Sequence, residues 1–312
     1  MTINASKRNL LALVQAACDE LGIPRQTQLV GNVDPGATQL LALANREGKE
    51  FSTASHRIGG WQEMRIEYTF NTAGVGSITG NTTNGSAIIT GMSTTTGIVA
   101  GYIGSINGFV SGVSVVSVDS STQVTMSANA TATATGVSMS FGSQSYSFPS
   151  DFGYFIQQTM WDRAFRWQLL GPLEAQEWQV LKSGISPTGP RRRFRIMGNQ
   201  FYIDPVPSSV TTEVFEYYSN SWCQSAGQAL QTIWTADTDY YVLDDDAFIL
   251  GLKWRYLAAK KLDYQEEYNS WTMRTERLMA RNGGNRTLPL NATAAGVNFL
   301  NNNNVPDTGY GS

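Results

Sequence analysis

Residues 113–126 have the sequence VSVVSVDSSTQVTM, and this stretch decides what the middle of the chain can fold into. Its apolar side chains largely alternate with polar ones, at Val113, Val115, Val118, Val124 and Met126. Alternation with a period of two is typical of β-strands that bury one face. The stretch therefore predicts two short strands, Val113–Val118 and Gln123–Met126, that contribute to one apolar face.

The composition of this stretch extends over residues 71–145. These 75 residues contain one charged side chain, Asp119, together with 27 Ser or Thr and 12 Gly, and neither Pro nor Trp. Further runs rich in Val, Ile and Thr recur between glycine-containing breaks, at Ser86–Thr90, Ile98–Ile103 and Gly136–Phe141. Regular short strands with turn residues between them predict an all-β domain. Disorder is the alternative for such a composition, but a disordered segment lacks the apolar face.

The chain on both sides has a different composition. Outside residues 71–145, 46 of 237 residues are charged, and all eight tryptophans lie there. The two flanks resemble each other, which predicts one host domain that is interrupted once. The expected domains are the host at 1–70 and 146–284, an all-β insertion domain at 71–145 and an extended C-terminal arm at 285–312. The expected fold class is α+β, with a mainly α-helical host domain that carries a small antiparallel β-hairpin region.

Periodicity in the host domain predicts its elements. Apolar residues three and four apart indicate helices at Leu10–Leu21, Pro35–Phe51, Ser150–Leu170, Leu173–Lys182 and a long helix at about Asp244–Arg281. Gly22 is a typical stop for the first helix, and Asp34 is a typical N-terminal cap for the second. Alternating residues indicate strands at Trp61–Phe70, Phe194–Met197, Gln200–Ile203 and Val210–Tyr218, with a turn at Gly198-Asn199.

The composition argues against most enzyme chemistry. The chain has a net charge of −3, one histidine, His56, and two cysteines, Cys18 and Cys223. Catalysis that pairs a nucleophile with a histidine would rest on His56 alone, and two cysteines at this spacing form no metal motif. No complete nucleotide-binding motif occurs, and no apolar run approaches the ~18 residues of a membrane span. The sequence predicts a protein that is not an enzyme, with no catalytic residue, metal, cofactor or membrane contact.

A group of aspartates marks the start of the long helix, at Asp237, Asp239, Asp244, Asp245 and Asp246. A calcium site is one interpretation, but an EF-hand-like loop needs a central Gly and a downstream Glu at fixed spacing, and both are missing. The preferred interpretation is a solvated acidic loop and a capped helix start, where the helix dipole favours anions.

The sharpest charge feature is a set of four arginines that opens an expected strand, Arg191, Arg192, Arg193 and Arg195. Alternation along the strand would place Arg191, Arg193 and Arg195 on one face and Arg192 with Phe194 on the other. One interpretation is contact with phosphate or with an acidic partner subunit. The other is an edge strand that is protected by its charge. The residues alone leave both open.

The segment 285–312 is rich in asparagine and weakly charged, with Arg286 and Asp307 as its only charged residues. Its apolar residues are scattered, at Leu288, Leu290, Val297, Phe299, Leu300 and Val305. Such a segment cannot build a core of its own. It is either a frayed terminus or an arm that folds onto a partner.

The host domain contains an ordered series of short motifs. They are DPGATQLLALANREG at 34–48, FPSDF at 148–152, WDR at 161–163, GPL at 171–173, QEW at 176–178, LKSGI at 181–185, TGPRRRFR at 188–195 and LDY at 262–264. Together they resemble the head-to-tail adaptor proteins of short-tailed bacteriophages, the tail tubular protein A-like connectors. The resemblance covers nearly all of 1–70 and 146–284.

The resemblance implies a structural protein of the virion, in the phage neck and tail, that is made in the cytoplasm of the host bacterium. Members of the family are mostly helical. Twelve copies form a ring beneath the portal protein, extend the DNA channel toward the tail nozzle protein and seal the packaged DNA. Their C-terminal arms reach the portal, which would assign 285–312. The arginine strand would then face the DNA in the channel, without sequence specificity, or a neighbouring copy in the ring.

Residues 71–145 separately resemble small β modules of phage virion proteins. The resemblance rests on GSAIITG at 85–91 and DSSTQVT at 119–125. It implies a peripheral module that decorates the neck or holds a tail fibre. The alternative function is a tail fibre or receptor-binding component of the virion that acts through this insert.

Overall fold

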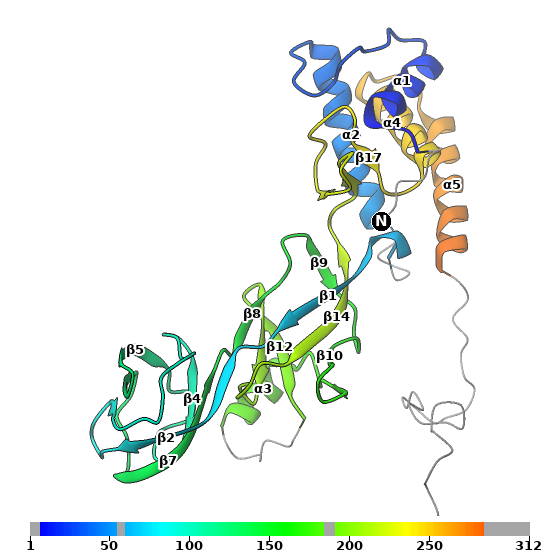
Figure 1. The fold of residues 1–312 in the computed structure, drawn as a ribbon. Helices are drawn as coiled ribbons and strands as arrows, with labels where there is room; N and C mark the ends of the chain where they lie inside the picture. The colour runs from blue at the N-terminus through cyan, green and yellow to red at the C-terminus, as the bar shows by residue number, and fades with distance from the viewer. Residues whose placement is uncertain (1–6, 55–59, 184–190, 284–312) are drawn as a thin grey trace, which may run out of the picture.

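The computed structural model of the chain describes residues 7–54, 60–183 and 191–283. Figure 1 shows an elongated molecule made of three units in a row. Four helices gather at one end, two sheets and a short helix lie in the middle, and the strands between residues 74 and 142 lie at the far end. The units are named the helical unit (7–54 and 220–283), the two-sheet unit (60–70 and 146–219) and the insert (71–145).

The helical unit contains four helices and a small sheet with the strand order β16-β15-β17. Its elements are α1 (Leu10–Leu21), α2 (Pro35–Ala54), α4 (Asp245–Ala259), α5 (Gln265–Gly283), β15 (Cys223–Gln224), β16 (Leu230–Gln231) and β17 (Tyr240–Tyr241). The predicted helix ends are confirmed. Gly22 adopts a left-handed φ of 66° after α1, and the Asp34 carboxylate accepts the N–H groups of Gly36 at 2.9 Å and Ala37 at 3.1 Å. Helix α4 packs against α1, α2 and α5 and is the centre of the unit.

An ion pair lies inside the core of the helical unit. The Arg255 Nε donates to Glu47 Oε2 at 2.5 Å, and the Trp271 indole N–H donates to Glu47 Oε1 at 2.9 Å. Glu47 is fully buried and Arg255 is 4% exposed. Burial raises the pKa of the Glu47 carboxyl, against the pull of the Arg255 charge. Gly251 of α4 faces this carboxylate, and any side chain there would overlap it.

The expected long helix from Asp244 to Arg281 is wrong, because the segment forms two helices. Lys261 takes a left-handed φ of 58° after α4, and the Asp263 carboxylate accepts the N–H of Gln265 at the start of α5. The two helices fold back on each other and bring the rings of Trp254 and Trp271 to 5.9 Å. A single helix would leave these apolar faces in water. Two helices that pack against each other bury them, and this burial favours a break in the helix.

The two-sheet unit packs two antiparallel sheets face to face over an aromatic core. One sheet has the order β1-β14-β10-β11, with β9 also paired to β14, and the other has the order β12-β13-β8. Its elements are a 3-10 turn η2 (Gln62–Met64), β1 (Arg65–Asn71), β8 (Ser145–Ser147), β9 (Phe152–Phe155), β10 (Trp161–Asp162), β11 (Trp167–Gln168), α3 (Ala175–Lys182), β12 (Arg193–Met197), β13 (Gln200–Asp204) and β14 (Thr212–Ser219). The predicted turn between β12 and β13 is confirmed, since Gly198 and Asn199 both have positive φ.

The expected helix at Ser150–Leu170 is wrong. This segment forms β9, β10 and β11, and Asp151 accepts the hydroxyls of Tyr217 at 2.8 Å and Ser219 at 2.7 Å instead of capping a helix. The helical spacing of its aromatic residues reflects packing on β14, where Phe152 lies 5.6 Å from Tyr217. The host region is therefore not mainly α-helical. Its fold is a mixture of α-helices and small antiparallel sheets.

The insert contains two three-stranded antiparallel sheets, with the orders β2-β7-β4 and β3-β6-β5. Its strands are β2 (Gly74–Thr82), β3 (Ile88–Ile89), β4 (Ile103–Ile106), β5 (Val115–Ser120), β6 (Gln123–Met126) and β7 (Ala134–Gly142). The predicted apolar face is confirmed in large part, since Val113, Val115, Val124 and Met126 are at most 2% exposed. Val118 is 40% exposed, although the register shift between Val115 and Ser117 pairs it with the buried Val124. The expected strand Ile98–Ile103 is mostly irregular, with a turn at Ala100 and Gly101, and β4 begins only at Ile103.

The insert is attached to the two-sheet unit by a close backbone contact. Gly74 of β2 and Gly142 of β7 pair with each other, and a side chain at either position would overlap the carbonyl of Pro207. Beside them, the hydroxyls of Thr72 and Thr211 lie 2.9 Å apart in a buried contact. The absence of side chains at the two glycines lets the insert lie directly on the loop after β13.

Candidate functional site

The arginines of the sequence lie along β12 and the residues just before it. Phe194 is 1% exposed, and the Arg192 side chain is 13% exposed, so both point inward and share a face as alternation predicts. Arg191 is exposed, and Arg193 and Arg195 are half-buried. None of these three forms an ion pair with a residue that the structure describes; the Arg195 guanidinium only reaches the Ala175 carbonyl of α3 at 3.5 Å.

Arg192 is the centre of a buried cluster. Its Nη1 donates to Thr211 Oγ1 at 2.6 Å and to Glu213 Oε1 at 2.8 Å, and it lies 3.3 Å from Asp162 Oδ2. Glu213 is fully buried and Asp162 is 3% exposed. The Asp162 carboxylate also accepts the N–H groups of Ala164 and Phe165 at 2.8 Å, which shapes the turn between β10 and β11. Arg192 thus joins β12, β14 and the β10–β11 hairpin, and its role is structural.

The cluster holds two carboxylates and one cation. Burial raises the pKa of Glu213 to about 7, with the Asp162 charge as a second cause, while Thr211 and Arg192 act against the rise. Glu213 Oε2 has no hydrogen-bond partner in the described part of the chain, so nothing there offsets the cost of burying its charge.

A cleft of about 720 Å³ lies between the insert and the two-sheet unit, beside this cluster. The insert contributes β4 and the loop at 109–112, and the two-sheet unit contributes the β10–β11 hairpin, the end of α3 and the loop after β13. Its charged lining residues are paired with each other, Arg192 with Asp162 and Lys182 with Asp204. The cleft therefore presents no unpaired charge from the described residues.

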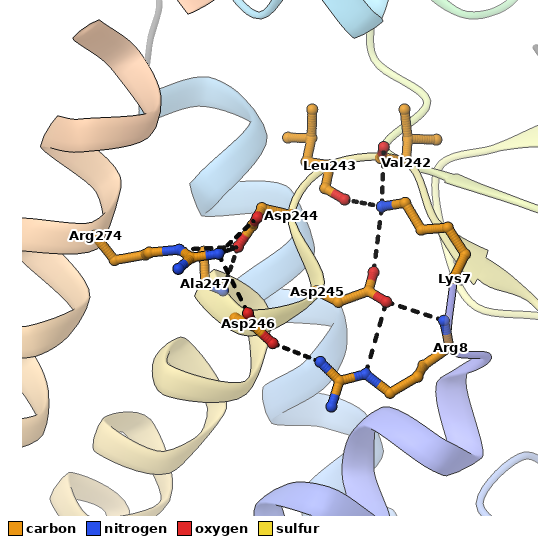
Figure 2. Close-up of polar contacts among 9 residues, drawn as sticks. All are labelled: Lys7, Arg8, Val242, Leu243, Asp244, Asp245, Asp246, Ala247 and Arg274. Atoms are coloured by element: carbon orange, nitrogen blue, oxygen red, sulfur yellow. Dashed lines mark hydrogen bonds and ion pairs between the residues drawn. The ribbon is translucent and has the colours of Figure 1, made fainter. Parts of the chain in front are cut away.

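The acidic group at the start of α4 serves helix capping and ion pairing, as Figure 2 shows. Asp244 accepts the N–H of Ala247 at 2.8 Å, which confirms the predicted cap. Arg274 of α5 contacts Asp244 at 3.0 Å and Asp246 at 3.2 Å. Lys7 and Arg8 reach the same place from the other side, and contact Asp245 and Asp246 (Figure 2). These aspartates hold the start of the chain, α4 and α5 together.

The other two aspartates of the group bind backbone N–H groups. Asp237 accepts from Val30 at 2.8 Å and Asp239 accepts from Thr235 at 2.8 Å. Across the described residues, no group of three or more His, Cys, Asp or Glu side chains has the arrangement of a metal site. The arrangement supports capping rather than calcium binding.

Sequence reasoning missed the partners of Arg192, because Asp162 and Glu213 lie on strands that are distant in the chain. The motif containing Asp162 was visible, but its link to Arg192 was not. The arm residues Leu288, Leu290, Val297, Phe299, Leu300 and Val305 lie outside the described residues, as does His56. None of the helices in the described part of the chain combines the length and apolarity that a membrane span requires.

Residues 118–295 match a family of phage structural adaptor proteins, and the match includes the arginine strand, the buried cluster and both helices α4 and α5. Because it covers more than half of the chain, the chain belongs to the SU10 adaptor protein family. No curated protein matches the chain. The expectation of a phage adaptor is confirmed at the level of this class, whose members are virion components that associate with other virion components and are typically non-enzymatic. The match begins inside the insert, at residue 118.

Proposed function

We propose that this adaptor forms a ring under the portal protein, extends the DNA channel, seals the packaged DNA and joins the portal to the tail nozzle or fibres. A homododecamer in the neck of a short-tailed phage is the arrangement that the sequence resemblance implies. The observation that carries the proposal is the set of Arg191, Arg193 and Arg195, which have no acidic partner among the described residues. Three cations close together suit the phosphates of channel DNA or an acidic surface on a neighbouring copy.

In a ring, the positive charge of Arg191, Arg193 and Arg195 is repeated in every copy. If each copy directs three arginines toward the axis, the lumen is lined by a band of positive charge, although each chain has a net charge of −3. Arg192 is excluded from this role, because its charge is engaged by Asp162 and Glu213. We propose contacts through Arg191, Arg193 and Arg195 only.

We further propose that residues 71–145 form a separate insertion domain that contacts a tail fibre. A core of its own supports this proposal, and the single charged residue of the insert, Asp119, is occupied by the hydroxyls of Ser117 and Thr125 at 2.6 Å. The insert therefore offers a polar surface with one carboxylate and no cationic side chain, which is better suited to a protein partner than to DNA. The same surface supports the second candidate function, a receptor-binding component of the virion.

The first experiment mixes the purified chain with portal rings of the same phage and measures the mass and the electron-microscopic image of the complex. A ring added at one end of the portal is expected. It should be lost on deletion of 285–312, if that arm binds the portal, and retained on deletion of 71–145. A folded chain that does not bind the portal would overturn the adaptor proposal and favour the receptor-binding alternative.

The second experiment tests the arginines with the triple variant R191Q/R193Q/R195Q. Channel contact predicts rings that assemble on the portal but leak DNA from filled heads, and contact between copies predicts rings that do not assemble. The control is K260Q/K261Q/R277Q, which removes three exposed cations from the helical unit. Normal assembly and normal DNA retention in the triple variant would exclude both roles.

A further inference from the structure

The β10–β11 hairpin exposes two aromatic side chains. Phe165 is 53% exposed and Trp167 is 42% exposed, and their ring centroids lie 5.9 Å apart at an interplanar angle of 31°. Every other phenylalanine and tryptophan in the described part of the chain is buried or half-buried. Because the fold covers these side chains everywhere else, two adjacent exceptions indicate a surface for a ligand.

Both aromatic side chains line the cleft between the insert and the two-sheet unit, and the hairpin that carries them is held in place. The Asp162 carboxylate, itself 3% exposed, accepts the N–H groups of Ala164 and Phe165 at 2.8 Å. The Arg192 guanidinium lies 5.9 Å from the centre of the Phe165 ring. The turn is thus fixed before a ligand arrives, which lowers the entropic cost of binding.

The facing wall of the cleft belongs to the insert and carries hydroxyl groups. Ser105 of β4 pairs with Ser140 of β7. Residues directly opposite each other in an antiparallel pair share a face of the sheet, so these two hydroxyls lie side by side. Ser111, in the loop after β4, is exposed and lines the same cleft. One wall therefore offers aromatic surface and the other offers hydrogen-bonding groups.

The charges in the cleft restrict what it can bind. Arg192 is paired with Asp162, and Lys182 is paired with Asp204. A nucleic acid would find no unpaired cation among the described lining residues. A purely apolar ligand would take the serine hydroxyls and the two carboxylates out of water without giving them hydrogen bonds. The cleft is therefore suited to a neutral ligand that has both apolar and hydrogen-bonding surface.

A sugar has this combination of surfaces. Its C–H groups form an apolar face that can stack on an aromatic side chain, and its hydroxyls donate and accept hydrogen bonds without carrying a charge. Carboxylates that already pair with a cation still accept from hydroxyls, because each oxygen has two lone pairs. The cleft volume of about 720 Å³ lies within the range of roughly 300–1,000 Å³ that is usual for ligand sites.

We propose that this cleft binds a neutral oligosaccharide, with one sugar stacked on Trp167 and Phe165 and its hydroxyls hydrogen-bonded to Ser105 and Ser140. The proposal goes beyond the adaptor role. It does not depend on the assembly of copies or on portal binding, so it is tested on the free chain. Neutral glycans of bacterial surfaces and storage α-glucans share this chemistry, and the test separates these two sources.

A glycan array with three arms tests the full chain: neutral glycans of bacterial surfaces, storage α-glucans and acidic glycans. Titration calorimetry then measures the Kd of the neutral glycan that binds. Trp167→Ala should weaken binding on the order of tenfold, because it removes the stacking surface, and Trp167→Phe should weaken it less. The control Tyr264→Ala removes a side chain that is 40% exposed on the helical unit and should leave the Kd unchanged. Circular dichroism melting shows whether each variant is folded.

A second pair of variants tests the wall that the insert provides. S105A/S140A removes two hydroxyls and should raise the Kd about fivefold. The control Ser138→Ala removes a hydroxyl two residues earlier on β7, outside the cleft lining, and should have no effect.

A decaproline peptide is titrated in parallel, because proline-rich segments also dock on exposed aromatic side chains. Binding of this peptide without binding of any neutral glycan would overturn the proposal and assign the aromatic pair to a protein partner. A folded chain that binds no neutral glycan, or binds only acidic ones, would also overturn it. So would a Kd that Trp167→Ala leaves unchanged.

Discussion

The helical unit and the insert differ in the side chains that their cores bury. The helical unit buries an ion pair, Glu47 with Arg255, among tryptophans and tyrosines. The insert buries only apolar side chains and a few threonines, and its one charged residue, Asp119, lies on the surface. The partners in the helical unit are 208 positions apart, whereas β5 and β6 of the insert are joined by a short turn. The ion pair of the first core depends on two residues that are distant in the chain, whereas the β5–β6 face of the second follows from a local pattern.

This comparison predicts that the helical unit is vulnerable to the loss of one charge. Arg255→Met would leave Glu47 buried without its cation, which should lower the free energy of unfolding by about 3–5 kcal/mol. Urea unfolding followed by tryptophan fluorescence measures it, since all eight tryptophans lie outside the insert. The control Arg46→Met removes an exposed pair with Glu50 and should cost at most about 0.5 kcal/mol. Equal losses in the two variants would contradict the distinction between buried and exposed pairs.

The insert, in contrast, should lose stability when a buried apolar side chain is shortened and leaves a cavity. Ile89 is fully buried and its neighbour Ile88 is 40% exposed, so they form a matched pair of one residue type. Ile89→Ala should destabilise the insert by about 2–5 kcal/mol, and Ile88→Ala by less than about 0.5 kcal/mol. Hydrogen exchange of peptides within 74–142 measures the loss. The tryptophan-detected transition should not move, and a shift of that transition would show that the two cores unfold together.

The two-sheet unit tests whether a buried charge always stabilises. Because the folded pKa of Glu213 is raised to about 7, the folded chain binds more protons than the unfolded chain between about pH 4.5 and pH 7. Stability should therefore fall as the pH rises through this window, by up to about 3 kcal/mol. Urea midpoints across the window measure the slope. Glu213→Gln should flatten it, while Glu216→Gln, an exposed neighbour on β14, should leave it unchanged. A rise in stability over the window would contradict the assignment.

The same contrast explains what could be predicted from the sequence. The apolar face of β5 and β6 follows from alternation alone, and the caps at Gly22 and Asp34 follow from residue type. These features depend on neighbours in the chain. The helix expected at Ser150–Leu170 failed because its aromatic residues are spaced for packing on β14, and that strand lies some 50 residues away in the sequence.

The candidate site divides in the same way. Alternation predicts that Arg192 shares a face of the strand with Phe194, and the structure agrees, with both side chains turned inward. It gives no sign that Asp162 and Glu213 receive the Arg192 charge, because their meeting depends on the order of strands in the sheet. The break between α4 and α5 was missed for a related reason: Lys261 carries no turn signal, and only the packing of Trp254 against Trp271 requires the chain to reverse there.

The smallest expected effect comes from an interaction between neighbouring residues in the helical unit, the cap that Asp34 forms at the start of α2. Asp34→Ala removes the cap that accepts the N–H groups of Gly36 and Ala37 and should cost about 1 kcal/mol. Asp34→Asn keeps an oxygen that can accept these bonds, so it should lower the free energy of unfolding by only about 0.3 kcal/mol. Both changes are read from the tryptophan-detected midpoint, and exchange within the insert should be unaffected. If Asn costs as much as Ala, the contribution of Asp34 is its charge at the helix dipole rather than its hydrogen bonds. The start of α2 would then be stabilised by a charge, as the buried pair at Glu47 is. Hydrogen bonds between neighbouring residues would not contribute measurably there.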